Sequence, residues 1–278
     1  MNANDQQEIR SIQLKCLEIL DEVDRICRKY DIAYSLCGGS VVGAHLYSGC
    51  LPWDDDIDLM MTRENYNRFL SAAKQELPNY YLIQNYNTTD DYYTLFTKIV
   101  DTRTTLVQKT DAKTVVSGVF LDITVYDKIS ENALVRSIDL FLWKLSQWCL
   151  TGKMNPTSIK NIVRNSFISL MGTPPTRYFK LLQWVLEKNE KAKNYTYSEF
   201  FGSFCNTKPY SKEIFENYAG ITFEGKQYMI VRDYVDYLVC RYERTDFREP
   251  KEKQVPSHYD YVDLNLPYRD YCADSYGA

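Results

Sequence analysis

The first apolar positions of the chain follow a helical period. They recur at steps of three and four residues, the spacing of one face of an amphipathic helix, and predict a helix that ends near Lys29. Residues 33–37 form a short apolar run that predicts a strand, and Gly38-Gly39-Ser40 and a short helix over 41–46 follow it. The periodic positions are Ile9, Ile12, Cys16, Ile19, Val23 and Ile26.

The next part of the chain is rich in strand patterns. Residues 56–61 alternate acidic and apolar side chains, which is the period-2 pattern of a strand, and a helix is expected over 64–77. Runs rich in Tyr, Val, Ile and Thr predict further strands at 80–84, 94–100, 104–107 and 119–125. We expect all these strands to form one mixed sheet with helices around it.

The second half of the chain has mainly helical patterns. Helices are predicted at 131–150, 158–171 and 176–193, with Pro174-Pro175 at the start of the third. A strand at 199–205, a hairpin over 221–230 that turns at Glu224-Gly225, and a helix at 233–242 follow. The polar tail from Thr245 should wrap the surface. The predicted fold class is α+β, with a core at 1–130 and a helical and α+β C-terminal region at 131–278 packed on it.

Composition excludes several classes of protein. The chain has 278 residues, of which 45% are hydrophobic and 25% charged, as in an ordinary globular protein. Its net charge of -4 argues against a nucleic-acid partner, because no basic excess exists to neutralise a phosphate backbone. No apolar run reaches the ~18–20 residues that cross a bilayer, so we expect a soluble, cytoplasmic protein without an integral membrane segment. Scattered cysteines and only two histidines argue against a zinc site.

The most informative segment is the acidic run at 54–58. Four carboxylates fall within five residues, and on a strand Asp54, Asp56 and Asp58 share one face while Asp55 points away. Acids held side by side next to a core are costly unless a cation compensates them, and Mg²⁺ prefers such hard oxygen ligands. The alternative is a solvated acidic turn, or an edge strand whose charge prevents aggregation.

Two other features favour a metal site. Gly38-Gly39-Ser40 lies where a strand meets a helix, and glycine N–H groups at a helix N-terminus bind anions. Asp122 is a lone carboxylate in the apolar strand at 119–125, although it could simply face the surface; Asp127 is expected to be a turn or cap residue. A Gly-Ser turn, paired acids and a later third acid are together similar to the site of nucleotidyltransferase-fold enzymes.

The segment from Gly39 to Asp58 resembles the LicD family, bacterial phosphocholine transferases related to fukutin. Its most specific part is the run Pro-Trp-Asp-Asp-Asp-Ile-Asp at 52–58. Lys98 and Asp122 stand where the family has a lysine and its later acid, and residues 223–225, 236–238, 250–253 and 257–258 are similar to its closing motifs. Leu46 departs from the pattern, because the family usually has a basic residue there.

The resemblance implies a nucleotidyltransferase-like mixed sheet and a phosphotransferase. The enzyme would use Mg²⁺, or Mn²⁺ in its place, to move a phospho-group such as phosphocholine from a CDP-linked donor to a glycan or glycolipid acceptor. Asp56, Asp58 and Asp122 would be the catalytic metal ligands, with Asp54 in reserve on the substrate side. The other substrate-binding candidates are Gly38, Gly39, Ser40, Trp53, Lys98 and His258, with Tyr92 and Tyr93 as further aromatic candidates for choline.

Two other functions use the same residues. A nucleotidyltransferase that attaches a nucleoside monophosphate to a small molecule would share every metal ligand, but the Pro-Trp-Asp-Asp-Asp lead-in argues against it. A non-catalytic binding module with the same fold is disfavoured because all three acids are present.

Overall fold

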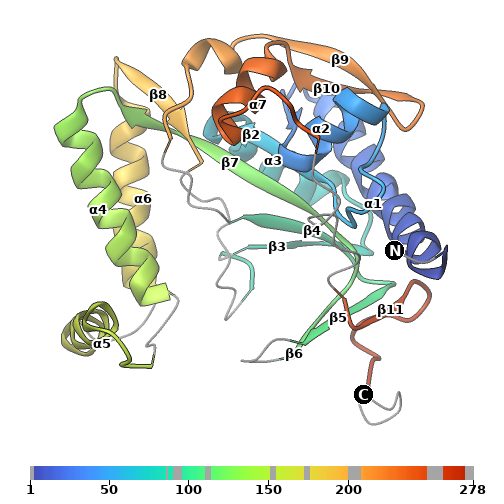
Figure 1. The fold of residues 1–278 in the computed structure, drawn as a ribbon, viewed down its shortest axis with the longest axis horizontal. Coiled ribbons are helices and arrows are strands. Elements are labelled where there is room, and N and C mark those ends of the chain that lie inside the picture. Colours follow the sequence, from blue (N-terminus) through green and yellow to red (C-terminus); the bar gives the residue numbers. More distant parts are fainter. Residues whose placement is uncertain are drawn as a thin grey trace. The chain divides into compact units, whose positions relative to one another are not determined.

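The structure is a computed structural model that describes residues 3–85, 87–89, 96–109, 114–150, 155–171, 176–199, 208–248 and 259–272. The chain forms two compact units (Figure 1), one made of Met1–Val125 and Glu213–Ala278 and the other of Tyr126–Lys212. We call them the acidic-site unit and the helical unit. The second unit begins close to the boundary expected near Ser130, whereas the C-terminal residues group with the N-terminal segment.

The acidic-site unit alternates helices and short strands. Its first half comprises α1 (Ala3–Lys29), β1 (Ser35–Leu36), α2 (Gly38–Tyr47), β2 (Asp58–Thr62), α3 (Arg63–Glu76), β3 (Tyr81–Gln84), β4 (Thr97–Asp101), β5 (Thr105–Lys109), β6 (Thr114–Ser117) and the start of β7 (Phe120–Ser130). Its C-terminal part adds the short helix η1 (Lys212–Phe215), β9 (Tyr218–Phe223), β10 (Lys226–Val231), α7 (Tyr234–Tyr242) and β11 (Tyr261–Asp263).

The main sheet has the strand order β1-β2-β7-β4-β3, so β2 and β7 are neighbours near its centre. β7 pairs antiparallel with β4, with Lys98 opposite Asp122, and β1 pairs antiparallel with β2, with Leu36 opposite Leu59. The α+β class and the mixed sheet flanked by helices are thus confirmed. This strand order brings the acidic run before β2 next to the later acid on β7.

The prediction of one sheet is wrong in one respect. β5 belongs to a separate three-stranded sheet, where it pairs with β6 and with β11 from the tail. The tail therefore contributes a strand, while β6, a short strand of Val and polar residues, was not predicted. A period-2 pattern predicts that a strand forms but does not say which edge it will pair with. The hairpin β9–β10 forms as predicted, with Glu224 and Gly225 at positive φ in its turn.

Helix α1 supplies much of the core, as its apolar period predicts. Ile12, Ile19 and Val23 are fully buried, and the helix packs on α3 and β4. Burying each such side chain stabilises the fold by about 1.5–3 kcal/mol. The polar face of the helix carries ion pairs, for example between Arg28 and Asp24, which lies one turn earlier, at 2.7 Å.

The helical unit contains α4 (Ala133–Leu150), α5 (Ile159–Met171), α6 (Thr176–Glu190) and β8 (Tyr195–Ser198), which pairs with the end of β7. The three helices were predicted; Pro174-Pro175 lies outside the described residues. The strand predicted at 199–205 lies outside the described residues except for Glu199, and β8 at Tyr195–Ser198 was not predicted. Asp127 is not a turn residue, because β7 continues to Ser130 and buries it. In the described residues no helix has both the length and the apolar character to cross a membrane.

Candidate active site

The acidic run lies on an extended loop that leads into β2. The strand begins at Asp58, whereas the alternating pattern predicted it from residue 56, so Asp54, Asp55 and Asp56 precede the sheet. Aspartate is disfavoured in strands, and three adjacent carboxylates repel each other, which explains why pairing starts later. The directions of the Asp54 and Asp56 side chains are therefore set by the loop and not by the pleat of a strand.

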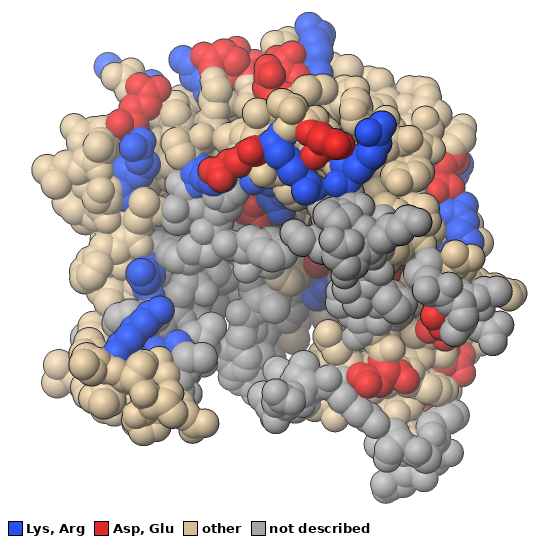
Figure 2. Space-filling view, in the orientation of Figure 1, with Lys and Arg blue, Asp and Glu red and all other residues tan. Residues whose placement is uncertain are grey.

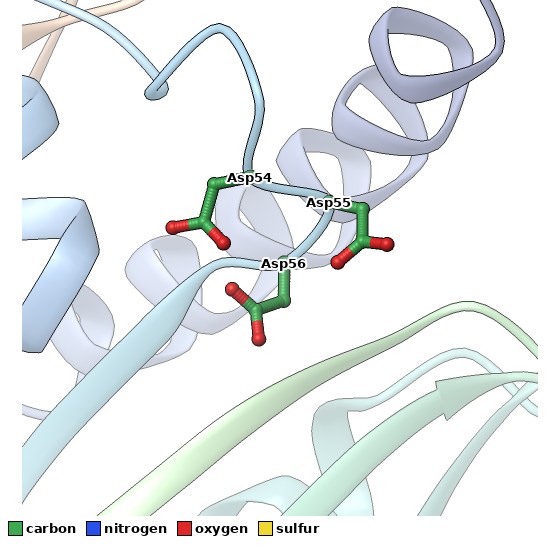
Figure 3. Close-up of side chains that lie close together, drawn as sticks. All are labelled: Asp54, Asp55 and Asp56. Carbon is green, nitrogen blue, oxygen red and sulfur yellow. The ribbon is translucent and has the colours of Figure 1, made fainter. Parts of the chain in front are cut away.

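The carboxylates of this loop lie close together. One oxygen from each of Asp54, Asp55 and Asp56 lies within 4.8 Å of the other two. Figure 3 shows the Asp54 and Asp56 carboxylates turned to the same side of the loop and the Asp55 carboxylate turned to the other. This tightest group differs from the predicted ligand set of Asp56, Asp58 and Asp122, and Asp56 is the member that the two sets share.

Asp58 and Asp122 are joined to the same cluster through the backbone. The N–H of Asp122 donates to the carbonyl of Ile57 at 3.3 Å, so Asp122 lies beside the short stretch that connects Asp56 to Asp58. Burial and the neighbouring charges of Asp56, Asp122 and Asp54 hold the pKa of Asp58 well above its ordinary value. The structure therefore brings the three predicted ligands into one electrostatically coupled group.

The pKa values of Asp54 and Asp122 are raised as well. Burial, with repulsion from Asp56 and Asp55, raises the pKa of Asp54 to about 8. Burial also raises the pKa of Asp122 to about 6, although the ammonium of Lys98 opposes that rise. A divalent cation would stabilise such a group of half-buried carboxylates with raised pKa values, because its charge lets all of them ionise together. The donor set thus fits Mg²⁺ or Mn²⁺, which bind carboxylate oxygens.

Lys98 is part of this cluster rather than a solvated surface residue. From β4 its ammonium contacts both Asp122 oxygens, at 3.0 and 3.2 Å. It lies over the ring of Phe120, 3.0 Å from the ring centroid, and its side chain is only 16% exposed. Lys98 therefore neutralises part of the charge on Asp122.

Gly38-Gly39-Ser40 forms the first turn of α2, so the helix begins earlier than predicted. Gly38 has φ +52°, a conformation that favours glycine, and its N–H donates to the Tyr237 hydroxyl at 3.1 Å. Ser40 accepts, through Oγ, a hydrogen bond from the Asp58 N–H at 2.9 Å. A Cβ on Gly39 would lie 2.7 Å from Asp54 Oδ2, so a side chain here would displace the Asp54 carboxylate. The hydrogen bond between Ser40 and Asp58 therefore holds the glycine turn against the acidic run.

Arg241 is the site residue that the sequence analysis missed. It comes from α7, and its Nε and Nη2 atoms lie 3.6 Å from where a Gly38 Cβ would be, while Asp58 Oδ2 lies 3.5 Å from that point. Its charge lowers the pKa of Asp58 against the larger effect of burial. A guanidinium thus stands at the glycine turn, in a chain that lacks the usual basic residue at Leu46. In the sequence, only Leu46 in place of that basic residue indicated that the site would need a positive charge from another part of the chain.

The loop before the acids is held by distant parts of the chain. The buried amide of Gln13 on α1 donates to the carbonyls of Leu51 and Asp54, at 2.9 and 2.7 Å. Glu224, in the β9–β10 turn, accepts from the Cys50 N–H at 2.9 Å and binds Arg10 through both carboxylate oxygens, at 3.0 and 2.7 Å. The Phe223-Glu224-Gly225 segment therefore positions the site loop.

The remaining candidates are less tightly integrated. Trp53 is half-buried and packs edge-on against Tyr47, with ring centroids 6.0 Å apart. Tyr92, Tyr93 and His258 lie outside the described residues.

Comparison with known proteins gives two matches. The nucleotidyltransferase domain described as LicD/FKTN/FKRP matches residues 31–139, a range that contains the glycine turn, the acidic run, Lys98 and Asp122. The chain is also 31% identical over 265 residues to the lipopolysaccharide cholinephosphotransferase LicD of Haemophilus influenzae, an alignment that covers 90% of this chain and 96% of the relative.

Proposed function

Because this chain belongs to the LicD family, we propose that it transfers phosphocholine, or a similar phospho-alcohol, from a CDP-activated donor to a glycan hydroxyl. The chain is a transferase of phosphorus-containing groups. The relative's name specifies cholinephosphate and lipopolysaccharide, and the match along almost the whole of both chains supports the same broad activity here. The CDP donor, the divalent cation and the glycan acceptor are the finer parts of the proposal.

The observation that carries the proposal is the convergence of Asp56, Asp58 and Asp122. Asp56 lies directly before β2 and Asp58 begins it. Asp122 lies on β7, and its backbone N–H donates to the carbonyl of Ile57, between the other two. We assign these three as ligands of Mg²⁺ or Mn²⁺. Asp54 is the fourth oxygen donor, since its carboxylate lies on the same side of the loop as that of Asp56 (Figure 3). When bound, the cation would neutralise donor phosphate charge and polarise the attacked phosphorus.

The chain's own residues then have distinct tasks. Arg241 would hold a phosphate of the donor at the glycine turn, where a planar guanidinium suits phosphate oxygens. The N–H of Gly39, in the first turn of α2, would donate to the same phosphate. Ser40 already accepts from the Asp58 N–H, so its hydroxyl proton is available to donate to a phosphate oxygen.

The transfer itself needs one bond made, one bond broken and one proton moved. An acceptor hydroxyl oxygen attacks the phosphorus that carries the alcohol group, and the bond from this phosphorus to CMP breaks, so that CMP leaves with the electron pair. Asp122 would take the hydroxyl proton, and burial raises its pKa to about 6, close to the range in which a base is effective. Lys98 would hold Asp122 in position for that step.

A nucleotidyltransferase reaction is the second candidate, because it would use the same acids. The two reactions differ in which phosphorus is attacked: the nucleoside-bearing phosphorus would yield a nucleotide-modified product and release the other phosphate group. The near full-length match to a cholinephosphotransferase favours the first reaction.

Ligand-induced stabilisation tests the donor class directly. Thermal unfolding would be followed with CDP-choline, CDP-ribitol, CDP-glycerol, CMP and ATP, each with and without Mg²⁺. A ligand that binds only the folded protein raises its apparent stability, by about 2.7 kcal/mol at a hundred times its Kd. We expect a CDP-alcohol with Mg²⁺ to raise the Tm most; stabilisation by ATP and not by any CDP-alcohol would favour the nucleotidyltransferase.

A further inference from the structure

The helical unit has a charge opposite to that of the rest of the chain. Residues 126–212 contain 13 Lys and Arg against six Asp and Glu, a formal charge of +7, while the whole chain carries -4. Between α4 and the last turn of α6, over residues 133–186, the one acidic residue is Asp139. It is fully buried and accepts from Lys188 at 2.6 Å and Asn189 at 3.0 Å, so it adds no negative charge to the surface.

The same helices expose large apolar side chains at helical spacing. On α4 these positions are four and three residues apart, and on α5 they fall at steps of three, one and seven, so each helix has one exposed apolar stripe. Eight such residues, between 50% and 85% exposed, are Leu134, Ile138, Phe141, Ile159, Ile162, Val163, Leu170 and Trp184. We call this set the apolar stripes.

The stripe on α5 is separate from the face that the helix uses for packing. Ile168 is buried, with Phe167 against it, and Arg164 is buried on the same side. Ile159 and Leu170, the most exposed of the set, lie on the opposite side of the helix. The exposed stripe is therefore not a core face that the fold has left half-packed.

Lysines flank both stripes. At 100° per residue, Lys144 lies beside the stripe of α4 and Lys160 beside that of α5, and both side chains are exposed. Figure 2 shows Lys and Arg atoms and uncharged atoms, but no acidic atoms, over the described surface of α5 at the lower left. Apolar side chains bordered by basic ones are typical of helices that lie in the interface of an anionic bilayer.

We infer that the helical unit docks the protein on an anionic lipid bilayer through the apolar stripes and the lysines beside them. Isoleucine and leucine enter the acyl boundary, while the lysines contact lipid phosphates. A second copy of the chain is a poor occupant, because two units of charge +7 would repel each other. Nucleic acid would match the charge but not the aliphatic stripes, since base binding uses aromatic stacking.

Vesicle co-sedimentation of the full chain tests the inference without measuring transfer. Vesicles of phosphatidylcholine alone would be compared with an equimolar mixture of phosphatidylcholine and phosphatidylglycerol. We expect binding to the mixture only, with release as salt is raised. The double variant Ile159→Gln/Leu170→Gln should bind at least tenfold more weakly, because two apolar side chains no longer enter the bilayer. Lys144→Glu/Lys160→Glu should lose at least fivefold per charge.

Matched controls in the acidic-site unit make the result specific. Leu14→Gln alters an exposed apolar residue of α1, and Lys74→Glu alters an exposed lysine of α3; both should leave vesicle binding unchanged. Far-UV circular dichroism and Tm would verify that each variant is folded. Equal binding to both vesicle types, equal losses in the controls, or a dimer in ultracentrifugation that Ile159→Gln/Leu170→Gln dissolves would each overturn the inference. None of these outcomes depends on the proposed reaction.

Discussion

The two compact units differ in which side chains they shield from water: the first shields carboxylates, and the second exposes large apolar side chains. The acidic-site unit keeps most of its site carboxylates half-buried, with the pKa values of Asp54 and Asp58 raised, and none of its described large apolar side chains is more than 49% exposed. The helical unit exposes every residue of its apolar stripes to 50% or more and carries a charge of +7. Both features oppose the stability of the isolated protein. Each is the reason for a partner that we propose: a cation for the first unit and a bilayer for the second.

This comparison predicts that the two units can be disabled separately. The largest effect is expected from Asp58→Asn, which removes a ligand carboxylate and should lower the rate of CMP release by roughly a thousandfold or more. Vesicle binding should not change. Turnover would be measured with CDP-choline and Mg²⁺, and Asp270→Asn, at an exposed C-terminal position, is the matched control. Near-normal turnover of Asp58→Asn would remove the metal assignment.

Arg241→Gln should produce the next largest effect. Losing a charged hydrogen bond to a phosphate costs about 1.5–3 kcal/mol, which corresponds to roughly a 10- to 150-fold loss in kcat/KM for the donor. Arg241→Lys should recover part of this loss, because it keeps the charge but not the planar fork. A loss that appears equally in Tm and in donor binding, without recovery by lysine, would show that Arg241 is only structural.

The buried acids also predict how stability depends on pH. Asp54 has a pKa of about 8 in the folded protein and an ordinary value of 3.8, so the unfolded chain releases its proton first as the pH rises. The carboxyl thus favours the unfolded state increasingly from about pH 4 to about pH 8, and stability falls across that window. In a chelating buffer the Tm should therefore drop between pH 5 and pH 8, by about 2–4 °C for each kcal/mol.

Mg²⁺ should reverse that loss, because ionised carboxylates are the form that binds it. The Mg²⁺-induced rise in Tm should be larger at pH 8 than at pH 5. Asp54→Asn removes one of the repelling charges, so it should raise the metal-free Tm at pH 8 and reduce the response to Mg²⁺. A Tm that rises with pH in chelating buffer would contradict the raised pKa values.

The smallest effect should come from the contact that positions the site loop. Glu224→Gln keeps the shape of the side chain but weakens its paired contact with Arg10, which is half exposed, so we expect a loss of about 1 kcal/mol in the free energy of unfolding. Turnover should fall severalfold, since the loop before Asp54 loses a tether. Urea unfolding gives the first value, and Lys226→Gln, which breaks the exposed pair with Asp21, is the control.

The local pattern predicted most elements of the fold but not their pairing. The apolar period of α1, the turn at Glu224-Gly225 and the three helices of the helical unit follow from spacing and turn chemistry. The partner of β5 did not, because pairing depends on contacts between residues that are far apart in the chain. The pattern also did not predict that β2 begins at Asp58, because alternation of acidic and apolar residues takes no account of the repulsion between adjacent carboxylates.

The same limit applies to the site. Asp56, Asp58 and Asp122 could be named from the sequence because they lie in or directly before recognisable strands and match a family pattern, although their role as ligands is still a prediction. Arg241 could not, because it lies on a helix just over two hundred residues from Gly38 and only the fold brings it there. Lys98 was named, but its contact with Asp122 depends on the register of β4 and β7.

Product analysis tests the central claim most directly. The purified protein would be incubated with CDP-choline, Mg²⁺ and lipopolysaccharide-derived oligosaccharide, and the products identified by mass spectrometry. The account predicts an oligosaccharide that has gained one phosphocholine, an equal amount of CMP, and neither product when the cation is chelated. An acceptor that has gained a cytidine monophosphate, or transfer that continues unchanged in the chelator, would contradict it.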